Sequence, residues 1–212
     1  MPLYTADAII LKTYELGEAD RIVVFLTRDR GKRRGVAKNA RRSRRRFGGA
    51  LEPMTCGRVG YTEREGRELV LLSYVEPIRS PLTLADVDAL GHLGYFAELV
   101  DEWVQDADPN EGVYRLGVSV VEALAAGVRT DRLARYFEYW LLRLQGVYEP
   151  DPRQSAGARA FLTAAQGCSP LRLAEVPVAP GVLGELEASH RALIAMHLEK
   201  DLKSVGVLKQ LR

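Results

Sequence analysis

Hydrophobic positions in the first part of the chain occur in short runs typical of β-strands. Four runs rich in β-branched and aromatic residues cover residues 7–14, 21–27, 58–62 and 68–75. Residues 31–37 are a fifth strand candidate, and a charged turn centred on Gly66 separates the last two runs. Five short strands with almost no helix between them predict a small antiparallel barrel, of either the OB-fold or the SH3-like type.

The hydrophobic period changes to a helical one after the connector Glu76–Pro81, whose two prolines disfavour a continuing regular element. Apolar residues then recur every three or four positions, which predicts helices over about 84–103, 113–127, 130–146, 156–165 and 182–196. The sequence therefore predicts an α+β protein. Residues 1–78 form a five-stranded barrel, and residues 79–212 form an all-α helical domain.

The composition is ordinary for a globular protein, with 47% hydrophobic and 27% charged residues in 212. No apolar run reaches the roughly 18 residues of a membrane span, and the N-terminus lacks the features of a secretory signal. We therefore expect a cytoplasmic protein with no membrane partner. Cys56 and Cys168 are far apart and belong to no CxxC pair, which argues against a disulfide framework or a four-thiolate zinc site.

Positive charge is concentrated in one segment. The chain has a formal net charge of +2, yet the segment Arg30–Leu51 holds ten basic residues and no acidic one. The remaining 20 basic and 28 acidic residues give the rest of the chain a net charge of −8. Such a dense cluster attracts phosphate, and each phosphate contact releases condensed counterions. The cluster is flanked by strand candidates, which favours nucleic-acid binding over a solvated loop or a localisation signal.

Aromatic residues of the barrel are candidates for stacking on bases. Phe47 directly follows three arginines and is the strongest candidate. Phe25 lies inside an apolar run and is expected in the core, whereas Tyr14, Tyr61 and Tyr74 lie near strand ends, where barrel packing is the expected role.

The segment GEADRIVVFLTRDRGKRRGVAKNARRSRRRFGGALEP (residues 17–53) resembles the N-terminal domain of the RecO family of bacterial DNA-repair mediators. The shared pattern is a G-E-x-D turn, a strand ending in L-T, a glycine, and then V-A-K-x-A-R-R with S-R. YFEYWLLRLQGVYEPDP (residues 136–152) and KDLKSVGVLKQL near the end also resemble family segments. The resemblance covers both predicted domains.

This resemblance implies an N-terminal OB-fold, a helical C-terminal domain, and binding to single- and double-stranded DNA. It also implies annealing of complementary strands and loading of the recombinase RecA onto gaps coated by single-strand-binding protein (SSB). The implied partners are RecR, RecA and the acidic C-terminal tail of SSB. Carried onto matching positions, the DNA-contacting role falls on Lys32, Arg33, Arg34, Lys38, Arg41, Arg42, Arg44, Arg45 and Arg46.

The helical domain has one departure from the family pattern. Many relatives carry four zinc-binding cysteines after the P-D element, but the segment EPDPRQSAGARAF that follows here has none. We expect helix packing to hold residues 150–180 in place. The SSB tail would need a hydrophobic groove with a few cations, among the helices that carry Arg129, Arg132, Arg135 and Arg143.

Catalytic patterns are missing from the sequence. His190 and His197 are seven residues apart, roughly 10 Å along a helix, too far to share one metal ion. No GxxxxGK[ST] loop occurs. A metal-dependent nuclease would have a P-D pair followed within a few dozen residues by [DE]-x-K, but after Pro150–Asp151 that sequence occurs only at Asp201–Lys203, about fifty residues further on. We expect a non-catalytic protein without metal or cofactor. The alternatives are an RNA-binding OB-fold factor of translation or ribosome assembly and, less favoured, a metal-dependent nuclease.

Overall fold

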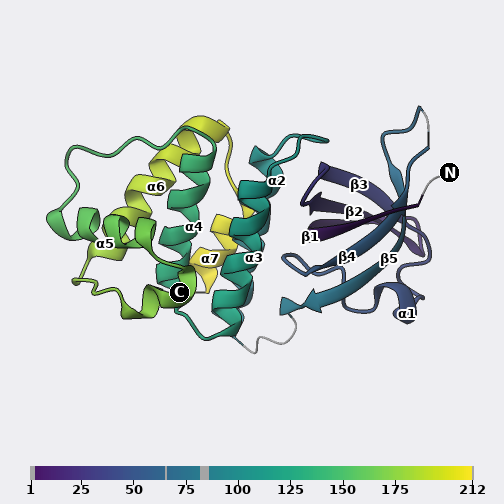
Figure 1. The fold of residues 1–212 in the computed structure, drawn as a ribbon, viewed down its shortest axis with the longest axis horizontal. Helices are drawn as coiled ribbons and strands as arrows, with labels where there is room; N and C mark the ends of the chain where they lie inside the picture. Colours follow the sequence, from purple (N-terminus) through teal and green to yellow (C-terminus); the bar gives the residue numbers. More distant parts are fainter. Residues whose placement is uncertain (1–2, 65, 82–85, 212) are drawn as a thin grey trace.

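The computed structural model describes residues 3–64, 66–81 and 86–211. A β-barrel and a helical domain lie side by side, with α2 and α3 between the barrel and the remaining helices (Figure 1). The barrel is built from β1 (Leu3–Leu16), β2 (Asp20–Thr27), β3 (Gly31–Ala37), β4 (Cys56–Thr62) and β5 (Val70–Arg79), with the short helix α1 (Arg44–Phe47) between β3 and β4.

The strands close in the order β1-β2-β3-β5-β4, and β4 pairs back onto β1. Only the β3–β5 pair is parallel, and the other neighbouring pairs are antiparallel. A closed five-stranded barrel of this kind is an OB-fold, so the predicted fold class is confirmed.

Two strands extend beyond the predicted limits. β1 begins at Leu3, and β5 continues through Pro77 to Arg79. The expectation that the prolines end the regular structure is therefore wrong for Pro77. Pro77 pairs with Gly57 at a point where the β4–β5 register shifts. A register irregularity tolerates proline, which has no N–H to donate to the ladder.

The five predicted helices occur in the predicted order, and the helical domain also contains a 3₁₀ helix and a C-terminal helix that the sequence did not predict. It contains α2 (Val87–Trp103), α3 (Glu111–Ala125), α4 (Thr130–Leu144), α5 (Ala156–Gly167), the 3₁₀ helix η2 (Pro170–Glu175), α6 (Val182–Leu198) and α7 (Lys203–Gln210). The first predicted helix includes positions 84 and 85, which lie outside the described residues. Phe161 and Leu162 of α5 are buried in the core, and Arg132 donates hydrogen bonds to the carbonyls of Leu173 and Val176 (2.6 and 2.7 Å). Helix packing thus holds residues 150–180, as expected.

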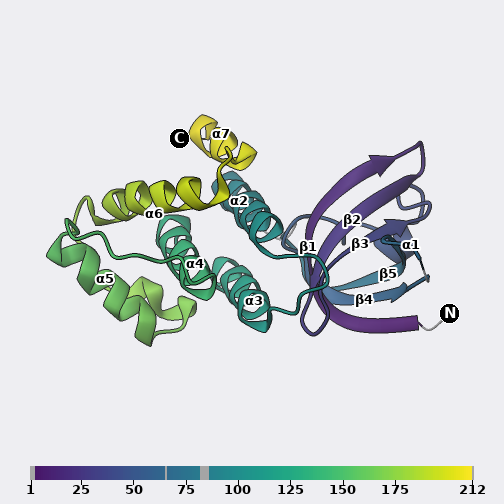
Figure 2. The same cartoon turned by 90° about the horizontal axis from the view of Figure 1, so that it is seen from above.

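Strand β2 has two buried faces, and this feature joins the barrel to the helices. Val23 and Phe25 face the barrel interior, whereas Val24 and Leu26 belong to the core shared with the helical domain. The two domains approach so closely that a Cβ atom on Gly117 of α3 would lie 2.6 Å from the side chain of Ile9. Figure 2 shows α2 and α3 facing the barrel. The helices therefore cover one part of the outer barrel surface.

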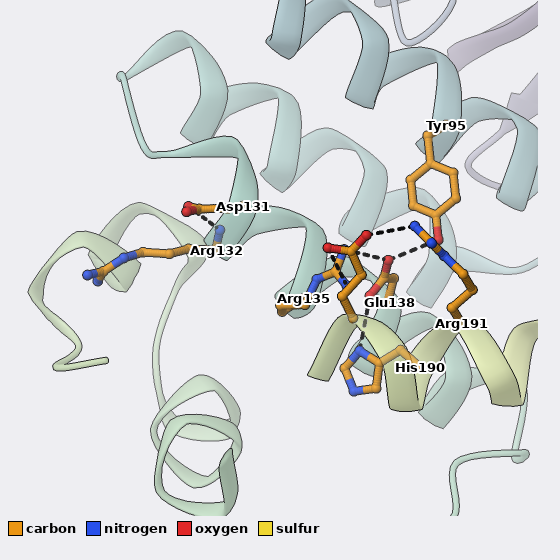
Figure 3. A network of polar contacts seen from close by, with 8 residues as sticks. Tyr95, Asp131, Arg132, Arg135, Glu138, His190 and Arg191 are labelled. Carbon is orange, nitrogen blue, oxygen red and sulfur yellow. Dashed lines mark hydrogen bonds and ion pairs between the residues drawn. The ribbon is translucent and has the colours of Figure 1, made fainter. Parts of the chain in front are cut away.

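A buried polar network connects α2, α4 and α6 (Figure 3). The Glu138 carboxylate accepts a hydrogen bond from the Tyr95 hydroxyl (2.9 Å) and pairs with Arg135 (3.0 Å). The Nδ1 atom of His190 lies 3.1 Å from the same carboxylate. The Glu138 carboxylate thus links groups from all three helices and fixes how they pack, while Arg135 Nη1 and His190 Nε2 have no hydrogen-bond partner among the described residues.

Candidate nucleic-acid interface

The β3–β4 connection carries the densest positive charge, and we call residues 38–46 the basic loop. Its backbone is fixed to the β1–β2 turn. The Asn39 N–H donates to the Asp20 carboxylate (2.8 Å), and the Arg41 N–H donates to the Ala19 carbonyl (3.1 Å). Asn39 adopts a left-handed conformation (φ 55°), which asparagine tolerates better than most residues. The loop therefore presents its side chains from a defined backbone.

Arg46 organises the basic loop from within. Its guanidinium donates hydrogen bonds to the Lys38 carbonyl (2.6 Å) and the Ser43 hydroxyl (3.0 Å), and it lies 5.0 Å from the centre of the Phe47 ring. Because two of its five N–H donors are used inside the loop, Arg46 helps to fix the shape of the loop. Its contact with DNA stays a prediction.

Four other cations of the loop point to solvent. Lys38, Arg42 and Arg45 are exposed and have no ion-pair partner among the described residues. Arg41 is also exposed, and it pairs with the exposed Glu15 carboxylate at 3.6 Å, a contact that water screens strongly. Arg44 begins α1, but its side chain lies outside what the structure describes. Figure 1 places α1 on the barrel side away from the helices.

Lys32 does not belong to this exposed group. It is only 5% exposed, and its ammonium lies 3.3 Å from the Asp101 carboxylate and 3.5 Å from that of Asp106. The backbone supports the same contact, because the Ala107 N–H donates to the Lys32 carbonyl (2.9 Å). The prediction that Lys32 contacts DNA is wrong for this structure, since its charge is neutralised at the domain interface.

The two arginines that follow on β3 differ from each other. Arg33 is on the same side of β3 as Gly35, whose Cβ position faces Phe25 in the barrel, and the Arg33 guanidinium approaches Glu63 (3.7 Å). Arg34 is on the outer side, half exposed, and pairs with Asp106 (3.2 Å). Strand alternation therefore directs Arg33 inward and leaves Arg34 outside but paired.

The stacking prediction for Phe47 is also contradicted. Phe47 is 2% exposed and packs in the barrel core with Ala50 and Leu51, so its ring offers no face to a base. Phe25 and Tyr61 are buried in the same core, as expected. Tyr14 differs from the expected packing role, because its side chain is 44% exposed on the outside of β1.

Two further cations, which were not predicted as site residues, lie beside the basic loop. Arg64 and Arg67, in the β4–β5 turn, line a surface hollow of about 360 Å³ together with Lys38. The sequence showed them only as part of a charged turn. They come close to Lys38 because β5 pairs with β3 in parallel, a non-local contact that no local pattern indicates.

The chemistry available here is that of phosphate binding. Guanidinium and ammonium groups bind phosphate oxygens through charge-assisted hydrogen bonds. Within residues 3–64, 66–81 and 86–211, no group of three or more His, Cys, Asp or Glu side chains is placed to hold a metal ion. None of the helices in those ranges is long and apolar enough to cross a bilayer.

Comparison with known proteins identifies the family of the chain. Residues 1–81 match the family model described as "Recombination protein O N terminal", and residues 84–156 match "Recombination protein O C terminal". The DNA repair protein RecO of Geobacter sulfurreducens is 34% identical over 238 aligned positions, covering 97% of both chains. The RecO protein of Koribacter versatilis is 45% identical over 154 positions, covering 70% of this chain and 61% of that protein. That of Anaeromyxobacter sp. (strain K) is 37% identical over 193 positions, covering 84% and 75%.

Proposed function

The chain belongs to the RecO family, and from this premise we propose that it is a non-catalytic mediator of recombination repair that binds DNA through its barrel. A role in DNA repair and recombination follows from the family. The finer proposal is that the protein binds single- and double-stranded DNA and anneals complementary strands. The observation that carries it is the group of exposed cations on the basic loop: Lys38, Arg41, Arg42 and Arg45.

Annealing follows from this electrostatic arrangement. Two DNA strands repel each other through their phosphates, and a basic surface that binds both strands lowers the repulsion. Phosphate contacts position a strand without covering the base edges, so the bases stay free to pair. Base pairing supplies the driving force, and no catalytic side chain is required.

The two parts of the chain have separate tasks in this proposal. Residues 1–78 bind DNA, and residues 79–212 bind protein partners. We propose that the protein acts on nucleoid DNA in the cytoplasm, together with RecR, and helps RecA to load onto SSB-coated gaps. The negative charge of the chain outside the basic segment discourages DNA from binding to the helices.

A groove between α3 and α4 fits the acidic C-terminal tail of SSB, which we propose as a ligand of the helical domain. It is a hollow of about 460 Å³ whose lining includes Tyr136, Trp140 and Pro170, with the exposed Arg115 at its edge. The exposed Arg143 lies 5.6 Å from the Trp140 ring. The other cations expected there are engaged elsewhere: Arg129 pairs with Asp131, Arg132 binds η2 carbonyls, and Arg135 is buried with Glu138.

Mixing labelled complementary oligonucleotides with the protein in EDTA tests the proposal. We expect accelerated duplex formation with no shortening of either strand. The triple variant Arg41→Glu, Arg42→Glu, Arg45→Glu should abolish annealing while retaining its circular dichroism spectrum. The matched control is Arg129→Glu, Arg153→Glu, Arg172→Glu, which has the same change in charge on exposed positions of the helical domain and should anneal normally.

Other outcomes favour the alternatives. Strand shortening that stops on chelation would indicate a metal-dependent nuclease. A strong preference for RNA over DNA of the same sequence would indicate an RNA-binding factor. Undiminished annealing by the Arg41, Arg42, Arg45 variant would refute the assignment of the basic loop.

A further inference from the structure

Four apolar side chains form a continuous row across the barrel. Tyr14 lies opposite Ile22 in the β1–β2 ladder. Ile22 lies opposite Val36 in the β2–β3 ladder, and Val36 lies opposite Leu71 across the parallel β3–β5 pair. Residues opposite each other in neighbouring strands share one face of a sheet. We call this row of Tyr14, Ile22, Val36 and Leu71 the outer stripe.

The outer stripe faces away from the barrel interior. The next residues along three of its strands, Val23, Ala37 and Leu72, are buried in the barrel core, so alternation directs the stripe outward. Val24 shares this outward side of β2, but the helical domain covers it. The stripe lies beyond that cover, with Tyr14 exposed and the other three members half-buried.

Cations surround this apolar row. Val36 and Leu71 form part of the wall of the hollow that Lys38, Arg64 and Arg67 line at one end. At the other end, the Lys12 ammonium lies 5.1 Å from the centre of the Tyr14 ring. The Glu68 carboxylate also lines the hollow. The carboxylates of Glu98 and Asp101 lie near Lys12, so cations are in excess at the hollow end of the row.

We propose that the outer stripe is a platform for the unpaired bases of single-stranded DNA, with the rim cations binding the phosphates on either side. This inference rests on the proposed function and divides its DNA contacts into two classes. Single strands can turn their bases toward an aromatic and apolar surface while their phosphates follow a basic track. In a duplex the bases are stacked inside and only phosphates face the protein. Duplex DNA therefore uses the basic loop alone.

A nucleic acid fits the stripe better than a protein partner does. A protein-binding surface of this kind would require charges at its rim that match the partner, and the hollow here carries Lys38, Arg64 and Arg67 against one carboxylate, that of Glu68. Lys38 belongs to both the hollow and the basic loop, so a strand that leaves the loop meets the stripe directly. Charge complementarity and this continuity select a polyanion with apolar faces.

The test compares single-stranded and duplex DNA of equal length by fluorescence anisotropy. The double variant Tyr14→Ala, Leu71→Ser should lose about 10-fold or more in affinity for single strands, because truncating a stacking residue has effects of that size. Affinity for the duplex should stay within about twofold. A 2-aminopurine probe in the single strand should also lose its fluorescence change on binding. The single variant Tyr14→Phe, which keeps the ring, should behave as the unaltered protein does.

The matched control is Leu3→Ala, Ile78→Ser, which removes exposed apolar side chains from the same two strands outside the stripe. It should change neither affinity. Equal losses for single strands and duplex in a folded stripe variant would overturn the inference, as would unchanged single-strand binding. A stripe variant that binds DNA normally but changes its oligomeric state on gel filtration would assign the stripe to protein contact. If the unaltered protein binds no DNA, the proposed function itself fails.

Discussion

The ammonium group of Lys32 on β3 lies 3.3 Å from the carboxylate of Asp101 on α2, where it also donates to the Asp101 carbonyl. This buried contact joins the barrel to the helical domain. The basic segment of the sequence therefore has two roles: its β3 part anchors the helices, and its loop part remains exposed to solvent. Charge density in the sequence identified the segment but not this division.

Lys32→Ala should destabilise the protein without weakening its binding to DNA. Removing Lys32 leaves the Asp101 carboxylate at the interface without its principal partner, and breaking a buried ion pair in this way costs about 3 kcal/mol. We expect a drop of that size in the free energy of unfolding, measured by urea denaturation, with unchanged DNA affinity under native conditions. Lys38→Ala is the counterpart and should show the reverse: loss of DNA affinity, with stability within about 0.5 kcal/mol.

Asp106→Asn should strengthen DNA binding. The Asp106 carboxylate lies 3.2 Å from the guanidinium of Arg34, so it occupies a cation that could otherwise bind phosphate. Removing that charge should free Arg34 and increase the salt dependence of single-strand binding by about 0.7 in the slope of log K against log salt. Glu111→Gln is the matched control, since it frees Arg28 from a 2.7 Å ion pair outside the basic segment. A gain of the same size in both variants would show that net charge alone is responsible.

The exposed arginines of the basic loop should determine how strongly the affinity for single-stranded DNA depends on salt concentration. Five phosphate contacts to a single strand correspond to a slope of about −3.5. Arg42→Ala, Arg45→Ala should reduce the magnitude of that slope by about 1.4, because two contacts are lost. Anisotropy titrations over a range of salt concentrations give the slope directly. An unchanged slope with weaker binding would mean that these arginines shape the loop rather than contact phosphate.

The sequence allowed the barrel and the order of the helices to be predicted because both depend on local periodicity. The burial of Phe47 could not be predicted in this way. Its neighbours in sequence are arginines, yet one turn of helix directs the Phe47 ring into the core. Likewise, the role of Arg64 and Arg67 depends on the parallel pairing of β3 with β5, which joins segments distant in the chain.

Removing the buried hydroxyl group of Tyr95 or of Tyr61 should have different effects on the stability of the protein. Tyr95 donates to the Glu138 carboxylate, and hydrogen bonds to charged groups contribute about 2 kcal/mol, so Tyr95→Phe should lower the free energy of unfolding by that amount. The Tyr61 hydroxyl is buried and has no hydrogen-bond partner among the described residues. Tyr61→Phe should therefore be neutral or stabilising. Equal losses in the two variants would contradict this difference between the Tyr95 hydroxyl, which contacts Glu138 (Figure 3), and the Tyr61 hydroxyl.

Glu98 on α2 should give the docking of α7 a dependence on pH. Burial raises the pKa of its carboxyl group, but hydrogen bonds from Ser204 and Lys203 and the nearby charge of Lys12 outweigh burial and lower the pKa below 4.5. A carboxylate with a lowered pKa stabilises the fold above its unfolded pKa, and this contribution is lost as the pH falls through the folded pKa. Glu98→Gln should thus weaken α7 at neutral pH by about 1 kcal/mol, the size of a helix-capping effect.

Urea unfolding and hydrogen exchange at the Ser204 amide measure this difference between Glu98→Gln and the unaltered protein. The difference should be constant above pH 4.5 and should shrink below it, because protonation of Glu98 makes the two proteins alike. Glu102→Gln is the control on the same helix. Glu102 pairs with the Lys200 side chain, whereas the Ser204 N–H donates to Glu98, so the effect of Glu102 on the Ser204 amide should be small at every pH. A Glu98 effect that persisted in acid would show that the side chain acts through packing rather than through its charge.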